Sequence, residues 1–183
     1  MQAPVRDIEF LNSIFDYKPE TGLLIWKFRK DVPGWWNGRY AGKEPSNKDK
    51  LGYIRAKITR GKFSAYVSVH RICFFLANGF VPEVVDHIDG NVSNNRAANL
   101  RAATFEKNTW NRIPNIGTAT GYKGVSVSSK RGIISGYVAR IGHGGYREYL
   151  GLFKTPEEAR DAYNKRELEL RPEWVRERED SNA

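Results

Sequence analysis

The sequence predicts an α+β protein built from two small units, and three features of the chain lead to that expectation. Segments with strand-like alternation and segments with helical spacing both occur along its 183 residues. After Arg112 this periodicity stops in an aperiodic stretch interrupted by glycine. Beyond that stretch, the pattern predicts three strands and then a helix. We therefore expect units at 1–112 and 122–171, a linker at 113–121 and a charged tail at 172–183.

The first unit opens with a predicted helix over 8–17, where apolar residues recur at close to helical spacing. A turn then leads into a predicted strand over 23–28. Residues 31–50 are rich in Gly, Pro and Asn, with scattered Lys and Arg, and predict a basic loop. Within this loop, Trp35 and Trp36 either cap a small core or stack on nucleic-acid bases.

Two further strands are expected over 52–58 and 63–69, because polar and apolar residues alternate there. Arg60-Gly61-Lys62 supplies the turn between them. The run VHRICFFLANGF over 69–80 predicts a helix with an apolar face, and Gly79 is a natural C-terminal stop.

The central stretch carries the densest polar chemistry. Asp86 and His87 stand side by side, and a loop built largely from Asp, Gly, Asn and Ser follows them. A helix-like run over 104–112 then carries Asn108 and Asn111. Ordering a long loop for packing alone would be costly, so a functional interpretation has to be tested.

The second unit predicts strands over 124–129, 135–141 and 147–153. Thr155-Pro156-Glu157-Glu158 is a capping box with proline at the first helical position, and the helix it starts is expected to continue to about Leu170. Three strands and one helix make a small βββα module.

Charge in this module is lopsided, because Glu148 is the single acid between Thr118 and Lys154, against several Lys and Arg. If one face of the sheet packs on the helix, alternation assigns to it Val125, Val127, Ala139, Ile141, Leu150 and Leu152. The opposite face then holds Ser126, Ser128, Val138, Arg140, Arg147 and Tyr149. A basic, polar sheet face opposite an acidic helix is typical of a strand-based DNA reader, and a solvated face without a partner is the alternative.

Bulk composition narrows the class of partner. A formal net charge of +9 and a pI near 9.7 favour a polyanion, nucleic acid before membrane, although such charge also simply keeps a protein soluble. The single cysteine, Cys73, excludes an internal disulfide and a multi-cysteine zinc site, and it suggests a reducing compartment. No signal peptide or bilayer-spanning run is visible, so we expect a cytoplasmic protein with no membrane partner.

Asp86 and His87 suit the hydrolysis of a phosphodiester. That reaction needs a base, a metal ion to stabilise developing charge, and a firmly held backbone. A carboxylate and an amide oxygen suit Mg²⁺, and a neutral imidazole suits a general base near pH 7. The base needs a partner on its other ring nitrogen, for which the carbonyl oxygen of a nearby Asn would serve. The alternative for any Asp-His pair is a solvent-exposed turn.

Residues 69–104, VHRICFFLANGFVPEVVDHIDGNVSNNRAANLRAAT, resemble the His-Asn-His (HNH) nuclease family, and more narrowly its homing-endonuclease branch in phage genomes and introns. The resemblance implies a ββα-metal fold, in which a β-hairpin and a helix grip one divalent metal ion per active site. It also implies a phage-encoded protein acting in a bacterial host.

The same resemblance assigns roles to individual residues. Asp86 corresponds to the first metal ligand and His87 to the general base, whereas Asn99 corresponds to the middle Asn that braces the hairpin and orients the base. Asn108 falls where the last metal ligand belongs, with Asn111 as the weaker candidate. Asp and Asn replace two of the family's histidines, which fits Mg²⁺ or Mn²⁺ and argues against zinc. His70, at the start of the predicted helix, is expected to be structural.

The second unit resembles the Apetala-type (ethylene-response-factor) DNA-binding domain, most specifically in YLGLFKTPEEARDAY. The resemblance implies a sheet laid into the major groove. It assigns the DNA contacts to Lys123, Ser126, Arg140, Arg147 and Tyr149. Plant members are richer in Arg and Trp there, so Ser126 and Tyr149 favour contacts to the DNA backbone over strict base readout.

Together these features predict a site-directed, metal-dependent DNA endonuclease, of homing type, that acts on double-stranded DNA. One catalytic block per chain predicts a nick from a monomer and, most simply, a double-strand break from a homodimer. The alternatives are a non-catalytic DNA-binding regulator of a phage or mobile element, and a nuclease of another kind, structure-specific or associated with packaging.

Overall fold

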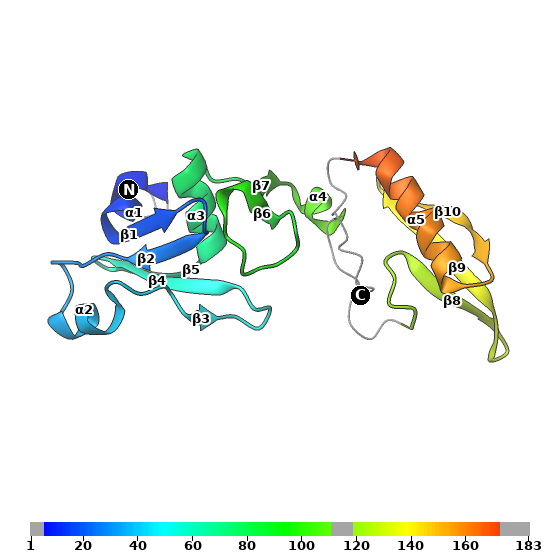
Figure 1. Ribbon diagram of the computed structural model, residues 1–183, viewed down its shortest axis with the longest axis horizontal. Helices are drawn as coiled ribbons and strands as arrows, with labels where there is room; N and C mark the ends of the chain where they lie inside the picture. The colour runs from blue at the N-terminus through cyan, green and yellow to red at the C-terminus, as the bar shows by residue number, and fades with distance from the viewer. Residues whose placement is uncertain (1–5, 111–118, 173–183) are drawn as a thin grey trace. The chain divides into compact units, whose positions relative to one another are not determined.

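A computed structural model describes residues 6–110 and 119–172 of the chain (Figure 1). The chain divides into two compact units, Met1–Thr109 and Trp110–Ala183. Small antiparallel sheets and short helices alternate along it, so the predicted α+β class is confirmed. Most of the predicted linker and nearly all of the tail lie outside the described residues. Within the described part of the chain, no helix has both the length and the apolar character to cross a membrane.

The elements of residues 6–110 are, in chain order, α1 (Ile8–Ile14), β1 (Phe15–Lys18), β2 (Leu23–Trp26), α2 (Gly34–Tyr40), β3 (Asn47–Lys48), β4 (Ile54–Arg60), β5 (Phe63–Ser68), α3 (Val69–Asn78), β6 (Val84–His87), β7 (Leu100–Ala103) and α4 (Phe105–Trp110). The pairs β1–β2 and β6–β7 are two-stranded antiparallel hairpins, and β3, β4 and β5 form one antiparallel sheet. The predicted strands at 23–28, 52–58 and 63–69 therefore form in the structure.

The helix predicted over 8–17 is wrong beyond Ile14. Asp7 caps α1 by accepting the N–H of Phe10 at 2.9 Å, and the backbone becomes extended at Phe15. Phe15 and the residues after it then pair with β2. Apolar residues spaced for one face of a helix also fit a strand at this point, and packing against β2 decides between the two.

The basic loop predicted over 31–50 is also only partly correct, because α2 and β3 form within it. Trp35 and Trp36 have different surroundings. Trp36 packs edge-on against Trp26, with ring centroids 5.1 Å apart, whereas Trp35 is exposed. Core packing therefore accounts for Trp36.

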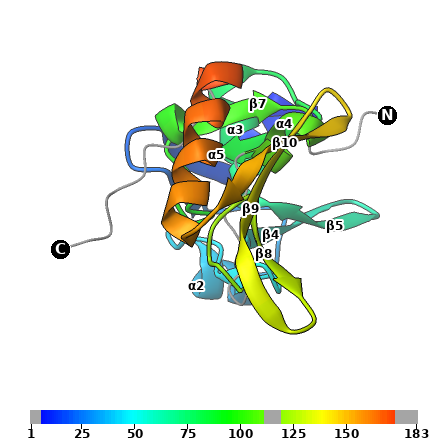
Figure 2. The ribbon, with the colours of Figure 1, turned by 90° about the vertical axis from the view of Figure 1, so that its right-hand side faces the viewer.

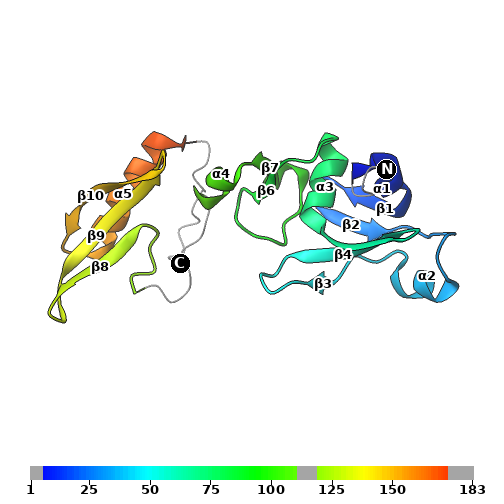
Figure 3. The same cartoon turned by 180° about the vertical axis from the view of Figure 1, so that it is seen from behind.

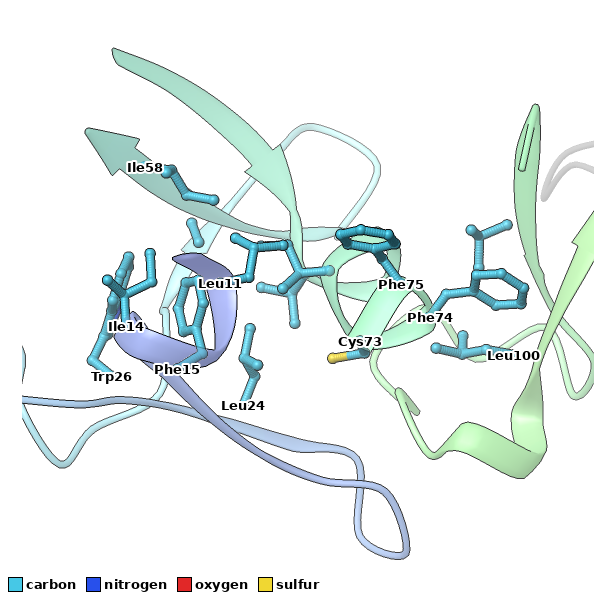
Figure 4. Close-up of a cluster of buried hydrophobic side chains, with 14 residues drawn as sticks. Leu11, Ile14, Phe15, Leu24, Trp26, Ile58, Cys73, Phe74, Phe75 and Leu100 are labelled. Carbon is cyan, nitrogen blue, oxygen red and sulfur yellow. The ribbon is translucent and has the colours of Figure 1, made fainter. Parts of the chain in front are cut away.

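The hydrophobic core of the first unit gathers around α3 (Figure 4). Helix α3 ends as predicted at Gly79, whose φ of 76° is the left-handed conformation of a helix stop. The fully or nearly buried core side chains include Leu11, Ile14, Phe15, Leu24, Trp26, Ile58, Ile72, Cys73, Phe74, Phe75 and Leu100. Leu100 belongs to β7, so this core also anchors the β6–β7 hairpin.

The second unit contains β8 (Val125–Lys130), β9 (Ile133–His143), β10 (Tyr146–Phe153) and α5 (Pro156–Leu170). These strands form one antiparallel sheet in the order β10-β9-β8, with α5 lying against it (Figure 2). The predicted strands, the helix and the Thr155–Glu158 capping box are confirmed.

One residue of the predicted helix-facing set is wrong. Leu152 lies opposite Val138 and is 53% exposed, because the β9–β10 register shifts between Tyr149 and Gly151. The bulge moves the residues after it to the other face of the sheet, so Phe153 joins the packing against α5 instead.

Candidate active site

Strands β6 and β7 form a hairpin (Figures 1 and 3). Asp86 and His87 are the last two residues of β6. Asp86 lies directly opposite Arg101, and His87 lies opposite Leu100. Both Asp86 and His87 are buried, so the solvent-exposed turn considered as an alternative is excluded. Neighbouring strand residues point to opposite faces, which separates the carboxylate from the imidazole.

The loop between β6 and β7 is held together by its own side chains, as expected from its composition. The side-chain Oδ1 of Asn99 accepts the N–H of Asp89 at 3.0 Å, and its side-chain Nδ2 donates to Asp89 Oδ1 at 2.9 Å and to the Asn94 backbone carbonyl at 2.8 Å. Asp89 Oδ2 accepts a further bond from the Asn94 amide at 2.7 Å. Asn99 therefore braces the loop through Asp89 and Asn94.

The charge of Asp89 is part of this brace. Partial burial by itself raises the pKa of Asp89, but hydrogen bonds from Asn94, Asn91 and Asn99 outweigh it and hold the pKa below its ordinary value. The loop thus keeps its central carboxylate ionised at neutral pH.

Asn95, and not Asn99, contacts the ring of His87. The Nε2 atom of His87 lies 3.2 Å from Oδ1 of Asn95, and both side chains are buried. If the amide oxygen accepts, Nε2 carries the proton, and Nδ1 is the basic nitrogen of the neutral ring. The expected Asn carbonyl partner of the base is therefore present, but it comes from the middle of the loop.

The β1–β2 hairpin contacts the backbone of Asn95 and its neighbours. The Tyr17 hydroxyl donates to the Asn95 carbonyl at 2.8 Å, and the Ala97 N–H donates to the Pro19 carbonyl at 2.9 Å. Gly22 lies so close that a Cβ there would meet the Asn95 carbonyl carbon at 2.6 Å. Residues of the β1–β2 hairpin, far from Asn95 in sequence, therefore fix the position of Asn95, the partner of His87.

Two aromatic rings complete the surroundings of His87. The ring of His70, from the first turn of α3, lies 5.2 Å from that of His87, and the ring of Tyr53 lies 6.0 Å from it. Tyr53 and His70 also contact each other, with centroids 5.0 Å apart. His70 is buried, which agrees with its predicted structural role.

Burial lowers the pKa of both histidines. For His87, burial lowers the pKa, while the Asn95 bond and the charges of Asp89 and Asp86 offset part of the effect. For His70, burial and the neighbouring His87 lower the pKa to about 3. Near neutral pH, both rings are therefore uncharged, and His87 is able to accept a proton.

Asp86 forms an ion pair across the hairpin. Both Nε and Nη2 of Arg101 lie 2.9 Å from Oδ2 of Asp86. The Asp86 side chain is only 7% exposed, so a buried carboxylate gains a compensating charge from its cross-strand neighbour. Sequence patterns do not single out Arg101 or Asn95, because their roles depend on strand register and loop path.

The predicted metal ligands are oxygen donors from two elements. Asp86 lies on β6, and Asn108 lies half-buried on α4, where its N–H bonds to the Thr104 carbonyl. Asn111, the alternative ligand, lies outside the described residues. In residues 6–110 and 119–172, no three His, Cys, Asp or Glu side chains gather into a metal-binding group. A carboxylate and an amide nevertheless fit Mg²⁺ or Mn²⁺, which retain several water ligands.

The predicted DNA-contact residues of the second unit separate into two groups. Ser126, Arg140, Arg147 and Tyr149 lie exposed on the sheet face away from α5. The Arg140 guanidinium lies 5.8 Å from the centre of the Tyr149 ring. The Lys123 ammonium instead contacts Glu167 of α5 at 2.6 Å and the Trp110 carbonyl.

The central block is similar to a known family of proteins. Residues 67–109 match the family described as HNH endonuclease. This range contains the β6–β7 hairpin, its loop and most of α4, so the similarity to HNH endonucleases falls on the candidate site.

Two curated proteins are similar to parts of the chain. Protein 3.8 of Escherichia phage T7 is 40% identical over 68 residues, which are 36% of this chain and 56% of that protein. The uncharacterized HNH endonuclease L560 of Acanthamoeba polyphaga mimivirus is 32% identical over 112 residues, which are 60% of this chain and 56% of that protein. The chain thus spans somewhat over half the length of these relatives.

A solved structure described as "DNA binding and cleavage by the HNH homing endonuclease I-HmuI" is also similar to the chain. The TM-score is 0.39 at 21% sequence identity, and the match covers 85% of this chain and 75% of the other.

Proposed function

We propose that this protein is a divalent-metal-dependent DNA endonuclease, of homing type, with His87 as its general base. The observation that carries the proposal is a buried His87, bonded to Asn95 and adjacent to Asp86, inside the range that matches HNH endonucleases. Burial also lowers the pKa of His87. The description of a curated relative as an HNH endonuclease supports the same reaction class.

In the proposed reaction, Nδ1 of His87 takes a proton from a water molecule, and the resulting hydroxide attacks the phosphorus. A new P–O bond forms, the bond to the leaving oxygen breaks, and that oxygen takes a proton from solvent. Asp86 and Asn108 would hold one Mg²⁺ or Mn²⁺ ion, which stabilises charge on the phosphate and the leaving oxygen when bound. Asn95 holds the ring in the tautomer that the step needs, and Asn99 braces the loop that carries Asn95.

Arg101 bears on how Asp86 takes part. Its two contacts fall on Oδ2 of Asp86, so the guanidinium fixes the orientation of the carboxylate. Arg101 would therefore hold Asp86 in place where Asp86 takes part in binding the metal ion.

The sheet of the second unit is the proposed DNA-binding surface. Arg140 and Arg147 are exposed cations beside the exposed ring of Tyr149, and Ser126 adds a small polar group. Such a face suits contacts to phosphates and sugars, which position a protein without reading sequence. The second unit would then hold the nuclease on duplex DNA, as in the Apetala-type domains that it resembles.

Incubation of supercoiled plasmid with Mg²⁺ or with EDTA tests the activity. The wild-type protein should nick or linearise the plasmid only with the metal, and His87→Ala should lower the rate by about 10²–10⁴-fold. His143→Ala, the same substitution at the end of β9, should cut like the wild type.

The ratio of nicked to linear product reports whether one or two copies act together. If no protein cuts, but the wild type and His87→Ala both retard duplex DNA in a gel, the enzyme assignment fails. The chain is then a non-catalytic DNA-binding regulator.

A further inference from the structure

The rings of Tyr53, His70 and His87 lie close together, although they come from three distant parts of the chain. Tyr53 comes from the residues just before β4, His70 from the start of α3, and His87 from the end of β6. The three centroid separations lie between 5.0 and 6.0 Å, with interplanar angles of 41–59°. Each ring is therefore tilted against both others, at separations within the range of about 4.5–7 Å over which aromatic rings interact.

Tyr53 is held firmly at this position. Asp49 Oδ1 accepts the backbone N–H of Leu51 at 2.9 Å and of Tyr53 at 3.0 Å, and the Asp49 N–H donates to the Tyr53 carbonyl at 3.0 Å. Gly52, in the same turn, lies against Val92 of the site loop. The turn that precedes β4 is thus part of the wall of the site.

His70 is held just as firmly, because it belongs to the buried side of α3. Its helical neighbours Val69, Ile72 and Cys73 all lie in the core. Since burial keeps His70 uncharged near neutral pH, it packs against His87 without electrostatic repulsion.

We propose that Tyr53 and His70 are positioning residues that hold the imidazole of His87 in the orientation from which it accepts a proton. Asn95 fixes one edge of the ring by a hydrogen bond, and the rings of Tyr53 and His70 restrict its rotation. This inference rests on the proposed role of His87 as the base. It adds two residues, outside the β6–β7 hairpin, that act through that base.

Single-turnover cleavage of plasmid tests the proposal, with DNA affinity measured separately in Ca²⁺ by gel retardation. His70→Ala should lower the cleavage rate by about 10–100-fold with little change in affinity, the usual effect of losing a group that orients a catalytic residue. His70→Phe keeps a flat ring against His87 and should retain most of the rate. Tyr53→Ala should likewise lower the cleavage rate, and Tyr53→Phe, which keeps the ring, should retain most of it.

Ile72→Ala is the matched control. Ile72 lies in the same helix, is also buried, and belongs to the hydrophobic core of the first unit. Assayed below its unfolding temperature, Ile72→Ala should cut like the wild type. If it slows cleavage as much as His70→Ala does, or if His70→Phe is as slow as His70→Ala, general loss of packing explains the effect and the proposal is overturned.

The double variant His70→Ala/His87→Ala should cut no more slowly than His87→Ala alone, because His70 acts through His87. A further loss in the double variant would overturn the proposal.

Long-range ¹H–¹⁵N spectra of the histidine rings supply a readout that does not need cleavage. In the wild type, the His87 ring should give sharp signals from one tautomer, with the proton on Nε2. In His70→Ala these signals should broaden or shift to a mixture, whereas Ile72→Ala should leave them unchanged. Unaltered His87 signals in His70→Ala would refute the inference whether or not the protein proves to be a nuclease.

Discussion

Gly22 ties the β1–β2 hairpin to the partner of the proposed base. Its φ is 79°, and a Cβ there would lie 2.5 Å from the backbone nitrogen of Arg96. Gly42 has nearly the same φ, 76°, but nothing within 4 Å of its own Cβ position. The two glycines therefore separate the cost of backbone strain from the cost of a close approach.

We predict that Gly42→Ala lowers the free energy of unfolding by about 1–2 kcal/mol through strain alone. Gly22→Ala should cost more than that, because the backbone at Asn95 and Arg96 has to move. It should also slow cleavage by about tenfold or more, since Asn95 would no longer hold His87 in place. Chemical denaturation and plasmid cleavage of both variants check the prediction, and equal effects at the two glycines would contradict it.

His70 predicts how stability depends on pH. The unfolded chain binds a proton at His70 with a pKa near 6.5, whereas burial lowers the pKa to about 3 in the folded protein. The unfolded state thus holds more protons as the pH falls below 6.5, and the free energy of unfolding decreases by up to about 1.4 kcal/mol per pH unit. The lowered pKa of His87 acts in the same direction.

His70→Phe should remove the contribution of His70, so its unfolding free energy should fall less steeply between pH 6.5 and 4.5. Urea titrations across this range measure the slope. Ile72→Ala, which changes a buried residue of the same helix and removes no titrating group, serves as the control and should keep the wild-type slope. A wild-type slope in His70→Phe would show that His70 does not titrate in this range.

At the level of elements, the bulge in β10 decides which leucine packs under α5. Leu150, within the register shift, packs against the small core of the second unit, whereas Leu152, after it, is exposed. Leu150→Ala should lower the unfolding free energy of this unit by about 1–2 kcal/mol. Leu152→Ala should change it by less than about 0.5 kcal/mol. Thermal unfolding of the two variants tests this, and the reverse ranking would mean that the strand runs without a bulge.

Elements with strong local signals could be predicted from the sequence. Alternation marks β4, β5 and the three strands of the second unit, and capping residues mark the end of α3 and the start of α5. The end of α1 could not be predicted, because the apolar pattern continues unbroken into β1. Helix α2 could not be predicted either, since a Gly-rich segment becomes helical there while Trp36 packs on Trp26.

In the candidate site, too, some residues could be predicted from the sequence and others could not. Asp86 and His87 could be singled out because an acid and an imidazole side by side suit metal-assisted hydrolysis. Asn95 could not be distinguished from its Asn neighbours, because only the folded loop shows which amide meets the ring. Arg101 depends on the β6–β7 register, and Tyr53 and His70 depend on contacts between elements far apart in sequence.

At the scale of the whole molecule, two compact units share the net charge of +9. The question for DNA binding is which cations release counterions from the duplex and which belong to the protein interior. In the second unit, Arg140 and Arg147 are exposed, whereas the Lys123 side chain is 18% exposed and bonded to Glu167. Equal losses of charge at these positions should therefore have unequal consequences.

We predict that Arg140→Gln and Arg147→Gln each weaken duplex binding and each reduce the slope of log affinity against log salt by about one. Lys123→Gln should leave that slope unchanged but lower the unfolding temperature, because Glu167, only 5% exposed, loses a compensating charge. Gel retardation in Ca²⁺ over a range of salt, with thermal unfolding in parallel, gives both quantities for the same three variants. A reduced slope for Lys123→Gln would mean that its ammonium leaves Glu167 for a phosphate on binding, as the Apetala-type resemblance implies. Unchanged slopes for both arginine variants would remove the sheet face from the DNA-binding surface and leave the first unit to supply the phosphate contacts.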